Sequence, residues 1–332
     1  MQTANANKSE LVIETKGLSR VYKTYKKKEG ILESIKGFWD RQYEEKVALA
    51  PTDLQIAGGQ IVGLVGANGA GKTTLLKMLS GLIHPSSGTA QVLGYTPWER
   101  KHDYLRQMSI LLGQKNQLWW DISPMDSYLL LADIYDIDKA TAIKRIHHLA
   151  EILKAEHVLQ TQLRRLSLGE RMKMEIIGAL LHEPKVLFLD EPTIGLDIVA
   201  QTSIRQFLAE YAKEKKPTII LTSHYMDDIA KLSDRLLLIS KGKMVYDGTV
   251  KDFTKKSRTY QKISFSLSEP LDKDLHIASQ NLTKGTQEIS IQISNEELQI
   301  ALTQITQISG VQNLKIEEAD FEDSIHAFLE AQ

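Results

Sequence analysis

The sequence predicts a mostly parallel, three-layer α/β domain followed by a smaller α+β domain. Short apolar runs such as Ile61–Val65, Val186–Leu189 and Thr218–Thr222 have the length and composition of strands buried on both faces of a sheet. Stretches with helical spacing separate these runs, as in proteins whose parallel sheet is covered by helices. After about residue 250 the pattern changes, so we place the second domain over residues 251–332.

The expected elements of the first domain, residues 1–250, follow from the spacing of apolar residues and from turn signals. They are strands over Leu11–Glu14 and Leu18–Tyr22, helices over Gly71–Leu82, Pro124–Ala155 and Ala200–Lys215, and a hairpin of Arg235–Ile239 and Met244–Tyr246.

Charge and composition limit the classes of function. The 332 residues carry 41 Lys and Arg against 42 Asp and Glu, a net charge of −1, so no global field attracts the chain to nucleic acid. There is no cysteine, which excludes disulfides and thiolate metal sites. No stretch approaches the roughly 18 uninterrupted apolar residues of a membrane span, and no secretory signal is visible. We expect a chain that does not cross a membrane by itself.

Residues 23–45 form a segment that a compact α/β domain does not require. A basic run, Lys26–Lys28, precedes a stretch from Gly30 to Tyr43 that is expected to be helical. Its apolar residues fall on one helical face: Ile31, Leu32, Ile35, Phe38 and Trp39. Two interpretations stay open, namely that this face packs on the domain itself, or that it contacts a bilayer or a membrane partner.

The second domain is expected to be structural or regulatory, because it has no glycine-rich loop and no carboxylate or histidine cluster. Lys251–Lys262 has the composition of a linker. The remaining elements are a half-buried strand over Ile289–Ile293, a helix over Leu298–Ile308 after a capping box of Ser294 and Glu297, a strand over Val311–Ile316 and a helix over Phe321–Leu329.

A glycine-rich loop follows the strand Ile61–Val65 and opens the next helix. Residues 66–73 read GANGAGKT, which matches the phosphate-binding pattern in its strand–loop–helix context. Backbone N–H groups and the helix N-terminus of such a loop surround phosphate oxygens. Lys72 would place its charge on the β- and γ-phosphates, and Thr73 would ligate Mg²⁺. The predicted nucleotide-binding residues here are Gly66, Ala67, Asn68, Gly69, Ala70, Gly71, Lys72, Thr73 and Thr74.

An acidic pair, Asp190 and Glu191, directly follows the apolar strand Val186–Leu189. The carboxyl end of such a strand faces the ligand crevice of an open parallel sheet. Asp190 would hold Mg²⁺, and Glu191 would act as general base toward the attacking water. Taken alone, an acidic pair after a strand is equally consistent with a solvated strand end.

Further motifs, in the right order over about residues 11–250, resemble those of ABC ATPases. Leu166–Arg171 reads LSLGER and resembles the family signature. Asp190–Thr193, Gly195–Asp197 and Thr222–His224 resemble its Walker B segment, D-loop and switch histidine. The resemblance implies a P-loop NTPase fold, the ABC cassette, with a helical subdomain over about residues 113–180. The GQKNQLWWD segment and the C-terminal domain resemble a bacterial subgroup that pairs with ABC-2-type exporter permeases.

The resemblance also implies a mechanism in which two chains enclose two ATP molecules head to tail. Ser167 and Gly169 of one chain would contact the γ-phosphate held by Lys72 of the other. His224 would hold the γ-phosphate and the attacking water beside Glu191. Asp197 would communicate across the dimer.

Three features depart from the family pattern or are ambiguous in it: the signature, the Q-loop glutamine and the adenine platform. Leu168 and Glu170 replace the second glycine and the glutamine of the signature. The Q-loop glutamine, a further catalytic residue and Mg²⁺ ligand in the family, is Gln114 or Gln117, and we favour Gln114. Tyr22 lies where the family places an aromatic platform for adenine, although core packing is an alternative and Tyr25 is a substitute.

The implied partners are a second copy of the chain, or a related ATPase, and an ABC-2-type permease on the cytoplasmic face of a membrane. The implied ligands are ATP and Mg²⁺, and no nucleic acid partner is expected. An importer ATPase and a non-transport ABC ATPase acting on nucleic acid or ribosomes are the alternatives. The latter is disfavoured because only about ninety residues separate the phosphate loop from the signature and because the chain holds a single cassette. A scaffold that binds ATP without turnover is disfavoured by the presence of Lys72, Asp190, Glu191 and His224 together.

Overall fold

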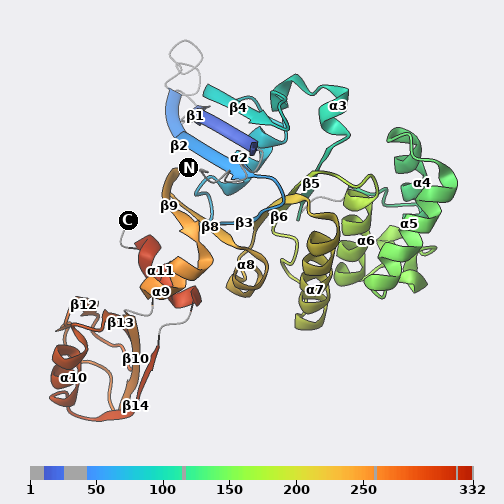
Figure 1. The fold of residues 1–332 in the computed structure, drawn as a ribbon. Coiled ribbons are helices and arrows are strands. Elements are labelled where there is room, and N and C mark those ends of the chain that lie inside the picture. Colours follow the sequence, from blue (N-terminus) through green and yellow to red (C-terminus); the bar gives the residue numbers. More distant parts are fainter. Residues whose placement is uncertain (1–10, 26–42, 114–116, 258–259, 319–320, 331–332) are drawn as a thin grey trace, which may run out of the picture. The chain divides into compact units, whose positions relative to one another are not determined.

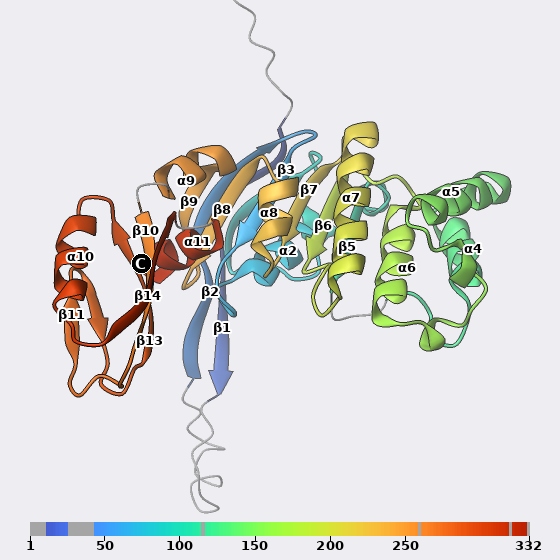
Figure 2. The same cartoon turned by 90° about the horizontal axis from the view of Figure 1, so that it is seen from below.

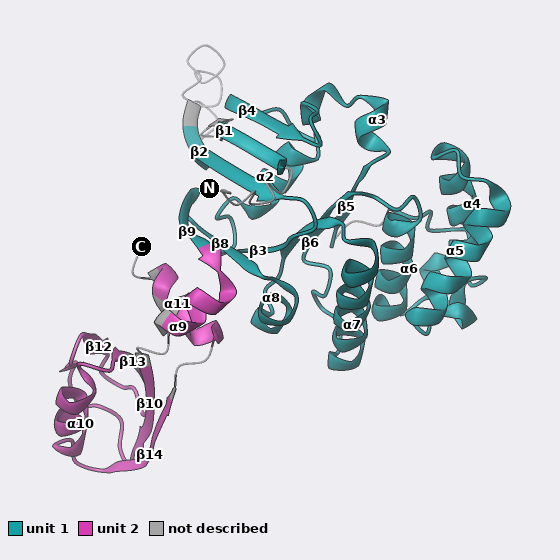
Figure 3. Ribbon diagram, in the orientation of Figure 1, with its two compact units in different colours: residues 1–247 teal, residues 248–332 magenta. Residues whose placement is uncertain are grey.

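The computed structural model describes residues 11–25, 43–113, 117–257, 260–318 and 321–330. The chain divides into two compact units, residues 1–247 and 248–332, which Figure 3 distinguishes by colour. The first unit is the predicted three-layer α/β domain, and the second is a small α+β domain. Within the described part of the chain, no helix is long and apolar enough to cross a membrane.

A six-stranded sheet forms the centre of the first unit (Figure 1), in the order β5-β6-β7-β3-β8-β9. Its strands are β3 (Ile61–Val65), β5 (Met108–Leu112), β6 (Val186–Asp190), β7 (Thr218–Thr222), β8 (Arg235–Ser240) and β9 (Lys243–Thr249). The pairs β5–β6, β6–β7, β7–β3 and β3–β8 are all parallel. The carboxyl ends of β3, β6 and β7 therefore lie side by side at one edge, with Asp190 opposite Thr222 in the register.

An antiparallel sheet of three strands, β2-β1-β4, forms a second layer. Its strands are β1 (Leu11–Tyr25), β2 (Tyr43–Ala57) and β4 (Ser87–Val92). Helix α2 (Lys72–Leu79) joins this sheet to the central one, because Leu75, Leu76 and Met78 are fully buried in a cluster that includes residues of both sheets. This packing fixes the start of α2, and with it the phosphate loop, against β2.

Helices make up the remaining layers of this unit. Figures 1 and 2 both place α4 (Pro124–Ile134), α5 (Lys139–Ile152) and α6 (Leu168–Leu180) together beside the β5 end of the sheet. The other helices are α3 (His102–Leu105), α7 (Ile198–Lys215) and α8 (Met226–Leu232), with single 3-10 turns at Pro97–Glu99, Glu156–Val158 and Leu163–Arg165.

The predicted helix Pro124–Ala155 is two helices. The chain leaves α4 through Asp136, whose φ is 52°. Asp138 then caps α5 by accepting a hydrogen bond from the Thr141 amide at 3.0 Å. An acidic N-cap of this kind is a start signal inside a continuous helical pattern, and the prediction overlooked it.

Both described ends of the predicted insert 23–45 are strand, and of the helix expected over Gly30–Tyr43 only Tyr43 is described, as the first residue of β2. Strand β1 continues to Tyr25 and β2 resumes at Tyr43, with Lys23 opposite Glu45 and Tyr25 opposite Tyr43. The two separate segments expected over Leu11–Tyr22 are one long strand, which passes Gly17 at a φ of 56°. The predicted apolar face from Ile31 to Trp39 lies outside the described residues.

The second unit begins with helix α9 (Val250–Ser257), where the sequence was interpreted as a linker, so that interpretation is wrong. Val250 and Phe253 are buried, and Phe253 contacts the rings of Phe321 and Phe328 edge-on at 5.9 and 5.7 Å. The other elements are β10 (Tyr260–Leu267), β11 (Leu275–Ile277), β12 (Gln280–Leu282), β13 (Glu288–Ser294), α10 (Leu298–Thr306), β14 (Val311–Glu318) and α11 (Phe321–Glu330). Strands β13, β10 and β14 form an antiparallel sheet in that order.

Candidate functional site

The phosphate loop is held at both ends by close backbone contacts that only glycine permits. A Cβ on Gly66 would lie 2.2 Å from the Ile239 carbonyl oxygen, and a Cβ on Gly71, whose φ is 116°, would lie 2.4 Å from that of Ala48. Between these ends, Ala67, Asn68 and Gly69 are exposed, whereas Ala70 is buried. The exposed part of the loop, Ala67–Gly69, which we call its crest, is therefore open to a ligand. The two ends of the loop, Gly66 and Gly71, are fixed against the rest of the domain.

Lys72, the first residue of α2, is only 5% exposed, and its side chain lies along the loop. Its Nζ donates hydrogen bonds to the carbonyl oxygens of Gly66 at 2.6 Å and Ala67 at 3.2 Å. Burial lowers the pKa of Lys72, and the nearby Glu191 and Asp190 partly oppose that shift. An anionic ligand at the loop would supply the compensating charge that this buried ammonium lacks.

Asp190 ends β6 and is held by two threonine hydroxyls. Thr73 donates to its Oδ2 and Thr222 donates to its Oδ1, each at 2.8 Å. Thr73 lies one residue after Lys72, so the contact joins the start of α2 to the acidic strand end. The hydroxyl and the carboxylate are both hard oxygen ligands, the type that Mg²⁺ prefers. Among the described residues, no group of three His, Cys, Asp or Glu side chains could hold a metal alone.

Glu191 and His224 meet beside this contact. The Nε2 of His224 lies 2.9 Å from Oε1 of Glu191, and Glu191 retains about one fifth of its side-chain exposure. The Glu191 backbone has a φ of 56°, a left-handed conformation that is unfavourable for a residue with a Cβ. Its amide donates to both the carbonyl and the hydroxyl oxygen of Thr222, at 3.1 and 3.0 Å, which holds it in that conformation.

The sequence analysis did not identify Asp228, which ties several of these segments together. Asp228 lies in α8, is 1% exposed, and accepts hydrogen bonds from Thr193 at 2.5 Å and Ser223 at 2.7 Å. Arg205 of α7 donates to the same carboxylate through Nε at 2.9 Å and Nη2 at 2.6 Å. Thr193 follows the acidic pair and Ser223 precedes His224, so Asp228 positions both segments. An acidic residue four positions after the switch histidine was the available signal.

The signature segment begins helix α6 and takes no part in the Thr73–Asp190 and Glu191–His224 contacts. Ser167 caps α6 in a capping box: its N–H and hydroxyl donate to the Glu170 carboxylate at 2.9 and 2.7 Å, and the Glu170 amide donates back to the hydroxyl at 3.3 Å. These bonds lower the pKa of Glu170, so its charge stays beside Ser167.

The starts of α6 and α7 pack against each other. Asp197 caps α7 by accepting from the Ala200 amide at 2.8 Å, and a Cβ on Gly169 would lie 3.1 Å from the Cβ of Ala200. The following Ile198 and Val199 are about four-fifths exposed. The predicted residues Ser167, Gly169 and Asp197 are thus brought together, but no described contact joins them to the phosphate loop of the same chain.

Four other residues named in the sequence analysis have different outcomes. Gln114 lies outside the described residues, although the Gly113 amide before it donates to the Asp190 carbonyl at 2.8 Å. Gln117 uses its side-chain amide to donate to the Ile110 carbonyl, and its backbone N–H donates to Glu175. Tyr22 is partly exposed, the Arg20 guanidinium lies 4.6 Å from its ring centroid, and it neighbours the Val21–Val47 pair. Thr74 is half-buried in the first turn of α2.

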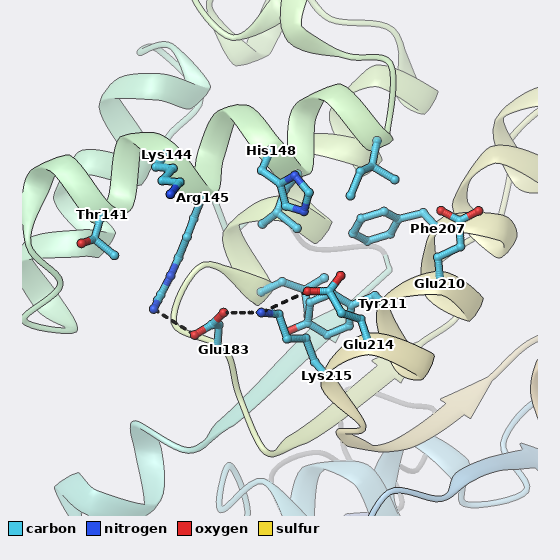
Figure 4. A pocket seen from close by; sticks show the side chains of 13 residues that line it. Thr141, Lys144, Arg145, His148, Glu183, Phe207, Glu210, Tyr211, Glu214 and Lys215 are labelled. Atoms are coloured by element: carbon cyan, nitrogen blue, oxygen red, sulfur yellow. Dashed lines mark ion pairs between the residues drawn. The ribbon is translucent and has the colours of Figure 1, made fainter.

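A separate cavity of about 420 Å³ lies between α5, the end of α6 and α7 (Figure 4). Phe207 and Tyr211 line it, and Glu183 forms ion pairs with Arg145 at 2.9 Å and with Lys215 at 3.1 Å. None of its lining residues belongs to the phosphate loop or to the acidic pair. It is therefore a different feature from the candidate nucleotide site.

Comparison with known proteins gives consistent matches to one family. The family model described as ABC transporter matches residues 49–194. The chain is 30% identical over 220 residues to the ABC transporter ATP-binding protein NatA of Bacillus subtilis, covering 66% of this chain and 89% of that protein. It is 34% identical over 206 residues to the Nod factor export ATP-binding protein I of Cupriavidus metallidurans, covering 62% and 67%. A dimeric post-hydrolysis structure of the ATP-binding cassette MJ0796, bound to ADP and Pi, superposes with a TM-score of 0.60 at 21% identity, covering 71% of this chain and 98% of that one.

Proposed function

The chain belongs to the ABC transporter family as an ATP-hydrolysing subunit, and from this premise we propose that it powers export through a separate membrane permease. The relative from Cupriavidus metallidurans is named for export, which supports that direction. The chain would act at the cytoplasmic face of the membrane and would be attached there through an ABC-2-type permease.

The observation that carries the catalytic part of the proposal is the run of contacts from Thr73 to Asp190 and from Glu191 to His224. ATP would bind at the exposed crest of the loop, where Lys72 exchanges its carbonyl partners for phosphate oxygens. Glu191 would accept a proton from the attacking water, with His224 holding both the carboxylate and that water.

Thr73 and Asp190 would hold Mg²⁺, and Gln114 would complete their set as the Q-loop glutamine. Their oxygens fit this ion, and the ion would neutralise developing phosphate charge. Gln117 is less suited to this role, because its side-chain amide is already bonded to the Ile110 carbonyl.

Two chains would bind head to tail, so that each phosphate loop faces the signature of the other chain. The separation of Ser167 from the phosphate loop within one chain supports this arrangement, as does the exposure of Ile198 and Val199 next to Asp197. In this dimer Ser167 and Gly169 would bind the γ-phosphate in trans. Tyr22 would stack on adenine.

A complementation experiment tests the composite site. Chains carrying Lys72→Ala and chains carrying Ser167→Arg are each expected to be inactive alone. Mixing them builds heterodimers with one intact and one doubly damaged site, so phosphate release should partly return. Native mass spectrometry verifies the composition of the heterodimers. If ATP is found only on separated chains in such a mixture, the head-to-tail arrangement is refuted.

The membrane partner is tested by co-purification. The full chain, tagged and expressed with the permease gene adjacent to its own, should be recovered in a detergent-solubilised complex whose ATPase activity exceeds that of the free chain. A neighbouring gene for a solute-binding protein, together with ATP-dependent uptake by right-side-out vesicles but not by inverted ones, would instead identify an importer.

A further inference from the structure

Strand β14 of the second unit is an edge strand that leaves part of its apolar face uncovered. The sheet order β13-β10-β14 gives β14 one described neighbour, β10. Ile316 lies opposite Ile263, which is fully buried, so both point to the core side of the sheet. Nevertheless Ile316 is 45% exposed and Leu314 is 40% exposed. Figure 2 shows β14 alongside β10, where the sheet ends.

An edge of this kind offers unpaired backbone groups and apolar side chains to another strand. We propose that β14 pairs antiparallel with β14 of a second copy of the chain, joining two three-stranded sheets into one of six strands. The contact would need no nucleotide, and it would be separate from the ATP-dependent dimer proposed above.

The charge pattern of β14 selects one register. Its sequence is VQNLKIEE, residues 311–318. When Ile316 lies on the two-fold axis opposite its own copy, each Lys315 faces a Glu317 of the other chain, giving two favourable cross-strand pairs. A shift of one position per chain in either direction places Lys315 opposite Lys315 or Glu317 opposite Glu317, which is unfavourable. Neither Lys315 nor Glu317 forms an ion pair within the described part of the chain, so both are available for this contact.

The same register gathers the exposed apolar residues. On the core side, the two Ile316 side chains meet at the axis, and each Leu314 lies diagonally beside the Ile316 of the other chain. Two exposed apolar side chains of each chain, four in the pair, would thereby be covered, which supports a second copy as the occupant. Only about five residues of each chain are paired, so the association is expected to be weak and best observed at high protein concentration.

Cysteine crosslinking tests the register directly, because the natural chain has no cysteine. Facing residues of an antiparallel pair have Cα atoms about 4.5–5.5 Å apart, within the range of a disulfide. Full-length Ile316→Cys, oxidised without nucleotide, should therefore form a covalent dimer. Leu314→Cys is the matched control: it lies on the same face with similar exposure, but its two copies would be about 13 Å apart and should not crosslink. Crosslinking of Leu314→Cys, or of Lys315→Cys in preference to Ile316→Cys, would overturn the register.

Charge reversal supplies an independent test that requires no oxidation. Lys315→Glu and Glu317→Lys each create two like-charge pairs, so each chain alone should self-associate at least about tenfold more weakly than the natural chain in sedimentation velocity. An equimolar mixture restores two opposite-charge pairs and should recover the association. Thermal unfolding of each variant checks that the second unit remains folded. A folded mixture that associates no better than either variant alone would refute the β14 contact.

The experiments are run without nucleotide and repeated in Lys72→Ala chains. Absence of an ATP-dependent dimer of the natural chain in Mg-ATP, with crosslinking at Ile316 intact without nucleotide and in Lys72→Ala chains, would count against the head-to-tail proposal only. The reverse result would count against the β14 contact only.

Discussion

The hydroxyl of Ser167 donates a hydrogen bond to the carboxylate of Glu170 at 2.7 Å. In the proposed dimer this hydroxyl binds a γ-phosphate, so the signature of this chain keeps a negative charge beside an anionic ligand. The carboxylate stabilises the helix start but opposes phosphate binding.

We therefore expect Glu170→Gln to strengthen ATP-driven dimerisation about fivefold, the equivalent of roughly 1 kcal/mol. The glutamine oxygen can still accept from Ser167, so the capping box should survive. Sedimentation with Mg-ATP measures the effect, with the exposed Glu151→Gln as control. Weaker dimerisation by a folded Glu170→Gln chain would contradict this assignment.

Glu191→Gln should retain ATP binding and reduce phosphate release by about 10²–10⁴-fold, because it removes the base and leaves the phosphate loop intact. It should also accumulate an ATP-bound dimer in gel filtration. Glu210→Gln, an exposed substitution of the same kind on α7, should leave turnover unchanged. Near-normal hydrolysis by Glu191→Gln would remove Glu191 from the role of general base.

Asp228→Asn should lower the free energy of unfolding by roughly 3 kcal/mol, because it removes the charge 2.6 Å from the mostly buried Arg205 guanidinium, whose other carboxylate partner, the exposed Asp227, lies 3.7 Å away. Turnover should fall as well, since Thr193 and Ser223 lose the acceptor that orients the acidic pair and His224. Its neighbour provides the control: Asp227 is exposed and pairs with Lys231 at 2.8 Å, so Asp227→Asn should cost less than about 1 kcal/mol. Urea unfolding compares the two. Equal effects would show that Asp228 is not a structural hub.

The affinity for ATP should fall as pH rises through the lowered pKa of Lys72. Bound phosphates favour the ammonium form of Lys72, so Lys72 keeps its proton in the complex at a pH where it has begun to lose it in the free chain. Binding therefore takes up a proton, and alkaline pH disfavours it. Lys72→Arg, which remains charged, should bind more weakly at neutral pH but without this dependence. Titration of a fluorescent ATP analogue between pH 7 and 10 measures both. Identical pH slopes for the two chains would be inconsistent with this origin.

Truncation after Thr249 should leave ATP binding intact, because every residue assigned to the site precedes the second unit. The nucleotide-independent association through β14 should be lost at the same time. Analogue binding and sedimentation of the truncated chain test both statements. A folded truncated chain without affinity for nucleotide would mean that the second unit completes the site.

The sequence predicts the central part of the fold well, because local pattern and tertiary context agree there. The strands Ile61–Val65, Val186–Asp190 and Thr218–Thr222 are continuous apolar runs, and the structure buries them on both faces of the sheet. Ser294 and Glu297 exchange the two hydrogen bonds expected of a capping box, at 3.4 and 3.3 Å, although α10 itself begins only at Leu298. Each of these signals is contained within a few residues.

The predictions are wrong where a sequence pattern is compatible with two kinds of structure, or where the structure depends on residues far away in the sequence. Lys251–Lys262 is charged enough to be taken for a linker, yet Val250 and Phe253 give α9 an apolar face whose partners, Phe321 and Phe328, lie about 70 residues later. The position of Asp228 four residues after His224 was a weak signal, because its importance comes from Arg205, Thr193 and Ser223 converging on it in space. The roles assigned to all of the site residues, Gln114, Tyr22 and Ser167 among them, remain predictions.

The left-handed backbone at Glu191 has a consequence for how such a chain can change. Glycine adopts that conformation without the cost a Cβ imposes, which is about 1 kcal/mol, and asparagine tolerates it better than glutamate. A lineage in which one copy of the ATPase no longer needed to hydrolyse ATP would gain thermal stability by accepting either residue at position 191. With Glu191 as the proposed general base, glutamate at this position would be retained for turnover against the preference of the backbone.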